Sequence, residues 1–563
     1  MPPRNAPRVA AAGRQPVVPA TAPGWLRPAI VALAALLALA WFSGEVGDSD
    51  TWWHLQTGQY LVQQHRLPVP DPFSFTTYTG RPSYAAEESV RRFNLTHEWL
   101  AQILLYLAYA AGGFAGLVLF RAALLAAFCG VVGWIAWRRT GGFYRAVGAA
   151  VAATWGAHLF ATDRPYLITF LLLAATLALA DAGRYWLLPP IFLLWANLHG
   201  GFFAGWLVLG AYCAAVLYER LRGRPVAQER TLFLATGLSV LLSGANPNGF
   251  RVLPIVLAYR SSPMQSTLWE WQYPNPWPPS AFSVLLVAAG VLLVWRRRDV
   301  RPVDWLLYLG FGAFSMVAVR NTILVALVGP VMLATYWPWK QPLAAIGEWL
   351  AATALVAGTV ALLAGGHAFQ LRAADWKYPS GAADFLLQHH ISAPMFNTYE
   401  LGGYLMWRLW PQEKVFIDGR ALNESVYQDY QRIAFNANAE GGKSGQELLR
   451  QYGIEAIVMD GFEYTNGAPY LLPAALADPH QSEWKLVYRD AQAVVFLRHP
   501  PADVQPLPNL EALSAMESQC AAYVEHDPSR PRCTLGLADL FQKIGDPARA
   551  SQWLARAQTL GVR

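Results

Sequence analysis

The apolar stretch WLRPAIVALAALLALAWFS at residues 25–43 decides the class of fold. Its length is close to the roughly 20 residues that a helix needs to span a bilayer. A secretory signal peptide has a shorter apolar region, and it is not followed by a series of further apolar runs as this stretch is. We therefore interpret residues 25–43 as a retained first membrane span.

The composition is typical of a chain that crosses the membrane repeatedly. Of the 563 residues, 54% are hydrophobic and 14% are charged, whereas soluble proteins carry about 25% charged residues. Trp and Tyr, which are favoured at membrane–water interfaces, number 24 each. The apolar content and the presence of only four Cys exclude a disordered chain, a collagen and a disulfide scaffold. The predicted fold class is an α-helical polytopic membrane protein.

Further apolar runs predict the remaining spans. They lie near residues 114–136, 146–162, 166–181, 186–198, 201–218, 231–244, 280–295, 303–319, 321–337 and 345–365. With the first span they give a transmembrane domain of roughly eleven helices over residues 25–365. The run 99–111 follows the polar pair His97-Glu98 and is shorter than the about 17 residues of a minimal span. We expect it to be interfacial or re-entrant and not to cross.

The basic residues indicate the orientation. If 99–111 does not cross, the Arg-rich loops all lie on one side, which the positive-inside rule makes the cytoplasm. These residues are Arg138, Arg139, Arg145, Arg220, Arg222, Arg224, Arg230, Arg296, Arg297, Arg298, Arg301 and Lys340. The tail 1–24 is then a disordered cytoplasmic segment. Membrane orientation thus accounts for the net charge of +6, and we expect membrane lipids, not nucleic acid, as partners.

Everything after Gly365 is expected on the extracytoplasmic side. Residues 366–500 predict a small α/β domain, with strands at 394–399, 414–418 and 453–460, a helix at 401–410 and a hairpin at 484–498. Residues 501–563 predict a linker and a helical tail that resembles one tetratricopeptide repeat. Such a repeat must pack on its neighbour or bind a protein partner, here through 509–563.

The four Cys fall into two pairs. Cys129 and Cys213 lie inside predicted spans, where a free Cys behaves as a small apolar residue. Cys520 and Cys533 lie in the external tail, where an oxidising compartment permits a disulfide. Both the bonded and the free state of this second pair remain open from the sequence.

The most informative polar motif is GDSDTWWHL at residues 47–55, directly after the first span. Asp48 and Asp50 lie two residues apart and His54 follows four residues later. This set can bind Mg²⁺ or Mn²⁺, or remove a proton from a hydroxyl group. The alternative is structural, with Asp50 capping a helix that begins at Thr51.

A second motif, HEWL at residues 97–100, closes the same external loop, 44–97. A carboxylate at the mouth of an apolar helix is costly unless it is hydrated or paired. We therefore expect Glu98 to converge with Asp50, with His97 beside it. The alternative is an acid that is favoured by the N-terminal end of the helix dipole.

Polar residues at the other external span ends complete the candidate site. An Arg at the outer membrane edge can grip a phosphate through two parallel charged hydrogen bonds. Alternatively, Asp163 and Arg164 merely neutralise each other or neighbouring charged groups. The candidates for binding substrate at these span ends are Arg164, Asn197, His199, Glu270, Arg320 and Asn321.

Taken in order, D-x-D-x-W-W-H-L, H-E-W-L, R-P, W-A-N-L-H-G-G, N-P-x-G, E-W and R-N resemble a group of prokaryotic membrane proteins related to the GT-C glycosyltransferase superfamily. The external segments FNTY (396–399), GGYL (402–405) and VFIDGR (415–420) belong to the same resemblance, which covers roughly residues 25–500. It implies a bacterial or archaeal plasma-membrane protein that uses a sugar carried on a polyprenyl phosphate. It also implies an acidic residue near the reacting centre, here Asp50 with Asp48 beside it.

The resemblance implies a transferase that moves this sugar, with inversion, to a hydroxyl group of a glycan, lipid or protein acceptor. Asp50 would be the base or would hold a divalent cation with Asp48, and Glu98 would support them. Arg164 and Arg320 would hold the lipid phosphate, and His54, His97, Asn197, His199, Glu270 and Asn321 would contact substrate. The alternatives are a polyprenyl-diphosphate-glycan ligase or polymerase, a non-enzymatic lipid or glycan transporter, and an assembly protein.

Overall fold

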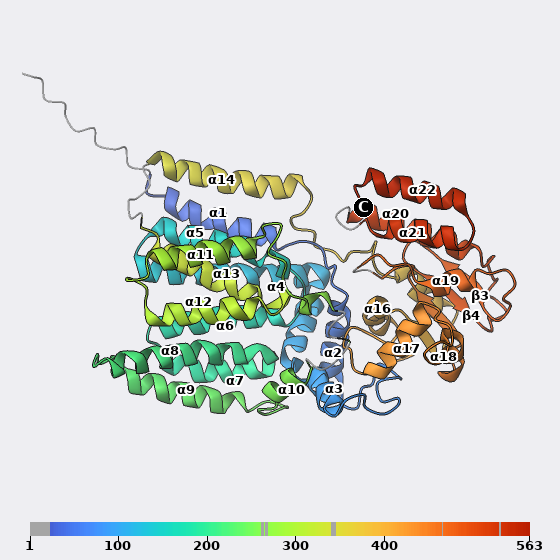
Figure 1. The fold of residues 1–563 in the computed structure, drawn as a ribbon, viewed down its shortest axis with the longest axis horizontal. Coiled ribbons are helices and arrows are strands. Elements are labelled where there is room, and N and C mark those ends of the chain that lie inside the picture. The colour runs from blue at the N-terminus through green and yellow to red at the C-terminus, as the bar shows by residue number, and fades with distance from the viewer. Residues whose placement is uncertain are drawn as a thin grey trace, which may run out of the picture.

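The computed structural model describes residues 23–259, 264, 268–338, 345–463, 466–527 and 531–562. The predicted cytoplasmic tail 1–24 lies outside these residues except for its last two, and Lys340 lies outside them as well. The described chain folds into a bundle of helices and a C-terminal α/β part that sits at one end of the bundle (Figure 1).

The bundle helices coincide with the predicted spans and run side by side along the long axis of the molecule (Figure 1). In chain order they are α1 (Leu26–Trp41), the second half of α4 (Trp99–Thr140), α5 (Phe143–Ala157), α6 (Tyr166–Asp181), α7 (Leu188–Leu198), α8 (Phe203–Leu221), α9 (Glu229–Ser243), α11 (Ala281–Trp295), α12 (Pro302–Ser315), α13 (Ile323–Tyr336) and α14 (Ala345–Ala364). Among the described residues, four helical stretches are long and apolar enough to cross a membrane, within Glu87–Thr140, Gly200–Leu221, Val319–Tyr336 and Ala345–Ala364. The total of eleven crossings remains a prediction.

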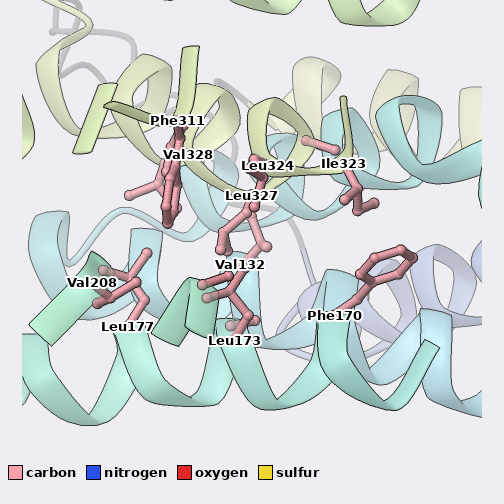
Figure 2. Packing of buried hydrophobic residues seen from close by; sticks show 14 of the residues in the cluster. Val132, Phe170, Leu173, Leu177, Val208, Phe311, Ile323, Leu324, Leu327 and Val328 are labelled. Carbon is pink, nitrogen blue, oxygen red and sulfur yellow. The ribbon is translucent and has the colours of Figure 1, made fainter. Parts of the chain in front are cut away.

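The centre of the bundle is helix α13. A helix that is apolar on all sides must be surrounded by protein or lipid, and α13 is buried along nearly its whole length. Figure 2 shows Leu327 of α13 against Val132 of α4 and Leu173 of α6. On α6, Phe170, Leu173 and Leu177 recur at helical spacing and so present one face to this centre. This rigid core fixes where the loops at each end of the bundle emerge.

The two ends of the bundle differ in chemistry. At one end, Arg139 and Arg301 each pair with both Asp181 and Asp304, at 2.8 to 3.2 Å. The loop that carries Asp48 lies at the opposite end, next to the C-terminal part. This separation agrees with the predicted grouping of the Arg-rich loops on one side, and the assignment of that side to the cytoplasm remains a prediction.

The loop after α1 contains two helices, α2 (Asp50–Gln64) and α3 (Glu87–Thr96). Within α4, Gly112 and Gly113 have non-helical backbone angles, so residues 99–111 form a separate helical segment. This segment packs against α2, because an added side chain at Gly58 would collide with the Gln102 carbonyl. In Figure 1, α2 lies across the end of the bundle. That residues 99–111 do not cross the membrane remains a prediction.

The C-terminal part contains a four-stranded sheet with the order β1-β2-β4-β3. β1 (Met395–Asn397) pairs parallel with β2 (Ala456–Met459), and β4 (Val494–Leu497) pairs antiparallel with β2 and with β3 (Lys485–Arg489). The helices of this part are α15 (Ser380–Gln388), α16 (Tyr399–Leu409), α17 (Glu424–Ala434), α18 (Gly445–Gln451) and α19 (Leu471–Leu476). The predicted strands at 394–399 and 453–460, the helix at 401–410 and the hairpin at 484–498 are confirmed.

The strand predicted at 414–418 does not form. The Val415 backbone bonds instead to the loop between α2 and α3, where its N–H donates to the Phe73 carbonyl at 3.1 Å and its carbonyl accepts from Phe75 at 3.2 Å. The next N–H, of Phe416, donates to the Asn397 side-chain oxygen at 2.8 Å. These partners satisfy the backbone groups that a neighbouring strand would pair, so the segment ties the loop to the C-terminal part.

The tail forms three helices, α20 (Glu511–His526), α21 (Cys533–Lys543) and α22 (Pro547–Thr559). Its apolar side chains, such as Met516 and Phe541, share one core with Leu486 and Phe496 of the sheet. The tail therefore packs on its neighbour, which is one of the two predicted outcomes. Cys520 and Cys533 form a disulfide. The likeness to a tetratricopeptide repeat remains a prediction.

Candidate functional site

The two carboxylates of GDSDTWWHL have different roles. The backbone N–H of Asp50 donates to the Asp48 side chain at 2.9 Å, so Asp48 and not Asp50 satisfies the N-terminus of α2. The Asp50 carboxylate instead reaches Arg164, with 2.9 Å between Asp50 Oδ2 and Arg164 Nη1. The proposal that Asp50 serves only as a helix cap is therefore wrong.

Arg164 is the centre of the acidic cluster. Its Nε and Nη2 contact both oxygens of Asp48 at 2.6 and 2.9 Å, a bidentate pair, while Nη1 reaches Asp50 and Glu270. Asp163, its sequence neighbour, points the other way and pairs with the buried Arg121 at 2.6 Å. Asp163 and Arg164 therefore do not neutralise each other, but each pairs with other charged groups, as the alternative also allowed. Arg164 thereby joins residues about 100 positions apart in the chain.

Arg320 lies on the far side of Glu270. Its Nη1 is 3.4 Å from Glu270 Oε1, and its guanidinium lies over the Trp271 ring, 4.5 Å from the centroid. The short helical turns η5 (Trp269–Trp271) and η6 (Val319–Asn321) hold these groups at the bundle end. The Arg320 side chain is 32% exposed, so its guanidinium is more open to the cavity than that of Arg164.

The electrostatic environment separates the two carboxyl groups. Withdrawal from water raises the pKa of Asp50 to about 7, with Arg164 opposing the rise and Asp48 adding to it. Burial also disfavours ionisation of Asp48, but the Arg164 guanidinium brings the pKa of Asp48 below its ordinary value. At neutral pH Asp48 is a fixed anion, and Asp50 is poised between its protonated and ionised forms.

A second polar cluster surrounds Glu98. His97 Nε2 is 3.1 Å and His199 Nε2 is 3.4 Å from Glu98 Oε1, while His54 Nδ1 is 3.6 Å from Glu98 Oε2. Burial lowers the pKa of His54 to about 4 and that of His199 to about 3. Burial alone would raise the pKa of Glu98, but attraction by the imidazoles, first that of His97, lowers it well below its usual value.

The C-terminal part covers the site where it packs against the start of α2. An added Cβ at Gly419 would collide with the Asp50 carboxylate, and one at Gly403 would come within 2.8 Å of the Ser49 carbonyl. Lys377 Nζ also donates to the Gly47 carbonyl at 2.9 Å. Gly419 lies in the VFIDGR segment, but the sequence predicts no role in the site for it. A close approach between segments that are distant in the chain leaves no pattern in one sequence.

The two clusters line a single cavity of about 1680 Å³ between the bundle end and the C-terminal part. Of the candidates from the sequence, its walls contain Asp48, Asp50, His54, His97, Glu98, Arg164, His199, Glu270, Arg320 and Asn321. Asn197 lies outside this lining. Its amide instead accepts from the Trp99 indole at 3.2 Å and donates to the Ala245 carbonyl at 2.8 Å.

The predicted divalent cation at Asp48 and Asp50 does not fit this arrangement well. Both oxygens of Asp48 and one oxygen of Asp50 already contact the Arg164 guanidinium. An Mg²⁺ ion prefers oxygen ligands in a near-octahedral shell, and here it would have to displace a charged group that already neutralises the pair. We therefore derive no chemical step through a metal at these two residues.

Comparisons with known proteins bear on the fold. The sequence matches no protein-family model and no curated protein. The structure is similar to that of the Archaeoglobus fulgidus oligosaccharyltransferase tethered to an acceptor peptide with an NVT sequon, at a TM-score of 0.51 and 12% identity over 88% of this chain and 77% of that one. It is equally similar, with the same values, to the oligosaccharyltransferase AglB of that archaeon in complex with an inhibitory peptide and a dolichol-phosphate. The chain thus shares its fold with these archaeal oligosaccharyltransferases.

Proposed function

We propose that the protein is a membrane glycosyltransferase of the GT-C class that takes its sugar from a polyprenyl-linked donor on the extracytoplasmic face. One observation carries this proposal. Asp50, whose pKa is raised to about 7, and the guanidinium of Arg320 line the same cavity at the bundle end. A base and a cation that face one cavity are what a transfer from phosphate to hydroxyl requires.

The reaction is a single displacement. The acceptor oxygen forms a bond to the anomeric carbon, and the proton of the acceptor group passes to the Asp50 carboxylate. The bond between the anomeric carbon and the phosphate oxygen breaks, and its electron pair leaves with the lipid phosphate. Because the attack and the departure occur on opposite faces of the sugar, the configuration inverts.

Arg320 is the better candidate to hold the departing phosphate. Arg164 already contacts three carboxylates, whereas Arg320 makes a longer ion pair, at 3.4 Å, with the single carboxylate of Glu270. A phosphate at Arg320 would need only Glu270 to shift. We assign Arg164 chiefly to the orientation of Asp48 and Asp50, and Arg320 to the negative charge that grows on the phosphate as the bond breaks.

The solved structures support this choice of substrates. The related folds are oligosaccharyltransferases, one with an acceptor peptide and one with a peptide and a dolichol-phosphate. They also keep open the second enzymatic candidate, the transfer of a whole glycan from a polyprenyl diphosphate. A transporter is less well supported, because the described polar clusters gather at one end of the bundle and not at its middle.

A donor assay tests the proposal. The purified full-length protein in lipid nanodiscs is incubated with polyprenyl-phosphate monosaccharides, with polyprenyl-diphosphate oligosaccharides and with hydroxyl or peptide acceptors. We expect release of lipid phosphate and an inverted glycosidic product with one donor class, which also decides between the two enzymatic candidates. Intact donors of both classes after prolonged incubation, in a protein shown to be folded, would contradict the proposal.

A further inference from the structure

The carboxylate of Glu98 is surrounded by imidazoles from three separate parts of the chain. His54 comes from α2, His97 from the end of α3, and His199 from the turn between α7 and η3 (Gly200–Phe202). The His54, Glu98 and His199 side chains are at most 11% exposed and that of His97 is 16% exposed. The proposed transfer reaction uses none of these four residues as base or phosphate ligand.

We propose that His97, Glu98 and His199 bind a divalent transition-metal ion of the Zn²⁺ type, with His54 as the fourth group. The ligand atoms of His97, Glu98 and His199 lie within 4.8 Å of one another, and His54 Nδ1 is 3.6 Å from the other Glu98 oxygen. The separations from Glu98 Oε1 to the two Nε2 atoms, 3.1 and 3.4 Å, match the spacing of about 3.3 Å between ligands in a tetrahedral shell with bonds of about 2.0–2.1 Å.

The hydrogen bonds behind His97 suit a metal ligand. Its Nδ1 lies 2.9 Å from the Phe93 carbonyl, which can accept the Nδ1 hydrogen, so Nε2, the nitrogen 3.1 Å from Glu98, is free to exchange its own hydrogen for an ion. The ring also stacks on Phe93, with the centroids 4.3 Å apart, which fixes its plane. Zinc-bound imidazoles are oriented in this way by a carbonyl or carboxylate on the other ring nitrogen.

His199 can bind at Nε2 through one proton exchange. Its Nδ1 is 2.8 Å from the Thr169 hydroxyl and 2.9 Å from the Gly201 N–H. With a metal at Nε2, the hydrogen moves to Nδ1 and is donated to Thr169 Oγ1, and the bond from Gly201 is given up. The Thr169 hydroxyl is already fixed in position to accept this hydrogen, because it also accepts a hydrogen bond from the Trp195 indole at 2.8 Å.

The chemistry of the cluster favours this class of ion over Mg²⁺. Imidazole nitrogens suit Zn²⁺ and its neighbours, whereas Mg²⁺ takes oxygen ligands and retains water. Within the described chain, Glu98 Oε2 is a buried oxygen without a hydrogen-bond partner. Buried polar atoms without partners are rare and often mark an ion or a function. The ion would join α2, the start of α4 and the α7–α8 turn.

Metal analysis of the full-length protein tests the inference. The protein in detergent is stripped with a chelator, loaded with Co²⁺, and examined by visible absorption and by elemental analysis after removal of free ion. We expect one ion per chain with the intense bands of tetrahedral Co²⁺, and their loss in the double variant His97→Gln/Glu98→Gln. The control His499→Gln changes an exposed ring, 88% open to solvent, and retains the bands.

Two further variants make the outcome unambiguous. Asp50→Asn retains the Co²⁺ spectrum, because that carboxylate contacts Arg164 and not the imidazoles. Thr169→Val removes the acceptor for His199 and weakens Co²⁺ binding by about 10- to 100-fold without unfolding the chain. Absence of ion in the folded wild type, or unchanged bands in the double variant, overturns the inference. Since no donor or acceptor is present, this result is independent of the transfer assay.

Discussion

Two Asp residues of one motif acquire different properties from their partners. Asp48 accepts two hydrogen bonds from Arg164 and one from the backbone of α2, so it is held as an anion. Asp50 contacts the same guanidinium through one oxygen and is withdrawn from water between α2 and Gly419. The sequence predicts that both matter, but it does not distinguish them, because Arg164 and Gly419 are remote in the chain.

The pH dependence of transfer follows from Asp50. Its pKa is raised to about 7, and only the ionised form can take the acceptor proton. The rate is therefore expected to increase as the pH rises through 7 and, well below that value, to fall about tenfold for each pH unit. The measurement is kcat/KM between pH 5 and 9, and a profile that is flat over this range would show that Asp50 is not the base.

Gly419 is predicted to be essential for the position of Asp50. The substitution Gly419→Ala places a methyl group where the Asp50 carboxylate now lies, and displacing a reacting group by about 1 Å can reduce the rate on the order of 100-fold. The matched control is Gly210→Ala in α8, where an added Cβ meets nothing within 4 Å. Equal transfer rates of the two variants would contradict the proposed contact.

At the scale of elements, the loop after α1 and the C-terminal part form one unit. Arg420 pairs with Asp418 beside it and with Asp71 of the loop, at 2.7 to 3.1 Å, and all three are buried. The bonds of Val415 with Phe73 and Phe75 lie next to this ion pair network. The loop is therefore held by the domain that follows the last bundle helix.

Removal of Arg420 is expected to separate these elements. Arg420→Ala leaves two buried carboxylates without their cation, which typically costs about 3–5 kcal/mol. The control Arg372→Ala removes a side chain that is 68% exposed and pairs with Glu45, and its cost is at most about 1 kcal/mol. Thermal or denaturant unfolding in the same detergent compares them, and similar losses in the two variants would refute the special role of Arg420.

The element-level predictions succeeded where the pattern is local. Apolar runs located the bundle helices, short apolar segments located β1 and β2, and alternation located the β3–β4 hairpin. The 414–418 segment has the composition of a strand, but its partners come from the loop 73–75 and from Asn397. Tertiary contacts of this kind override β propensity and cannot be inferred from one sequence.

At the scale of the whole molecule, the cavity exists because two parts meet. The bundle supplies Arg164, Glu270 and Arg320, the loop supplies Asp50, and the C-terminal part covers them with Gly419. The convergence of acidic and basic span ends was predictable, since alternate loops of a helical bundle emerge at the same end. The covering contacts were not, because they depend on how the domain docks.

The tail is predicted to stabilise the C-terminal part and not only to recruit a partner. Phe541 is fully buried in the shared core, so Phe541→Ala is expected to cost about 3–5 kcal/mol. Leu554, which is 45% exposed in the same tail, serves as the control through Leu554→Ala. Limited proteolysis of the C-terminal part measures the difference, and equal protection of both variants would indicate a tail that merely rests on the surface.

The most direct measurement of the central claim is sugar transfer by the variant Asp50→Asn in lipid nanodiscs. The variant keeps the size and shape of the side chain and removes its ability to accept a proton. We predict that it remains folded and membrane-inserted, with the unfolding midpoint of the wild type, while transfer from the polyprenyl-linked donor is abolished. Transfer at the rate of the wild type would contradict the account.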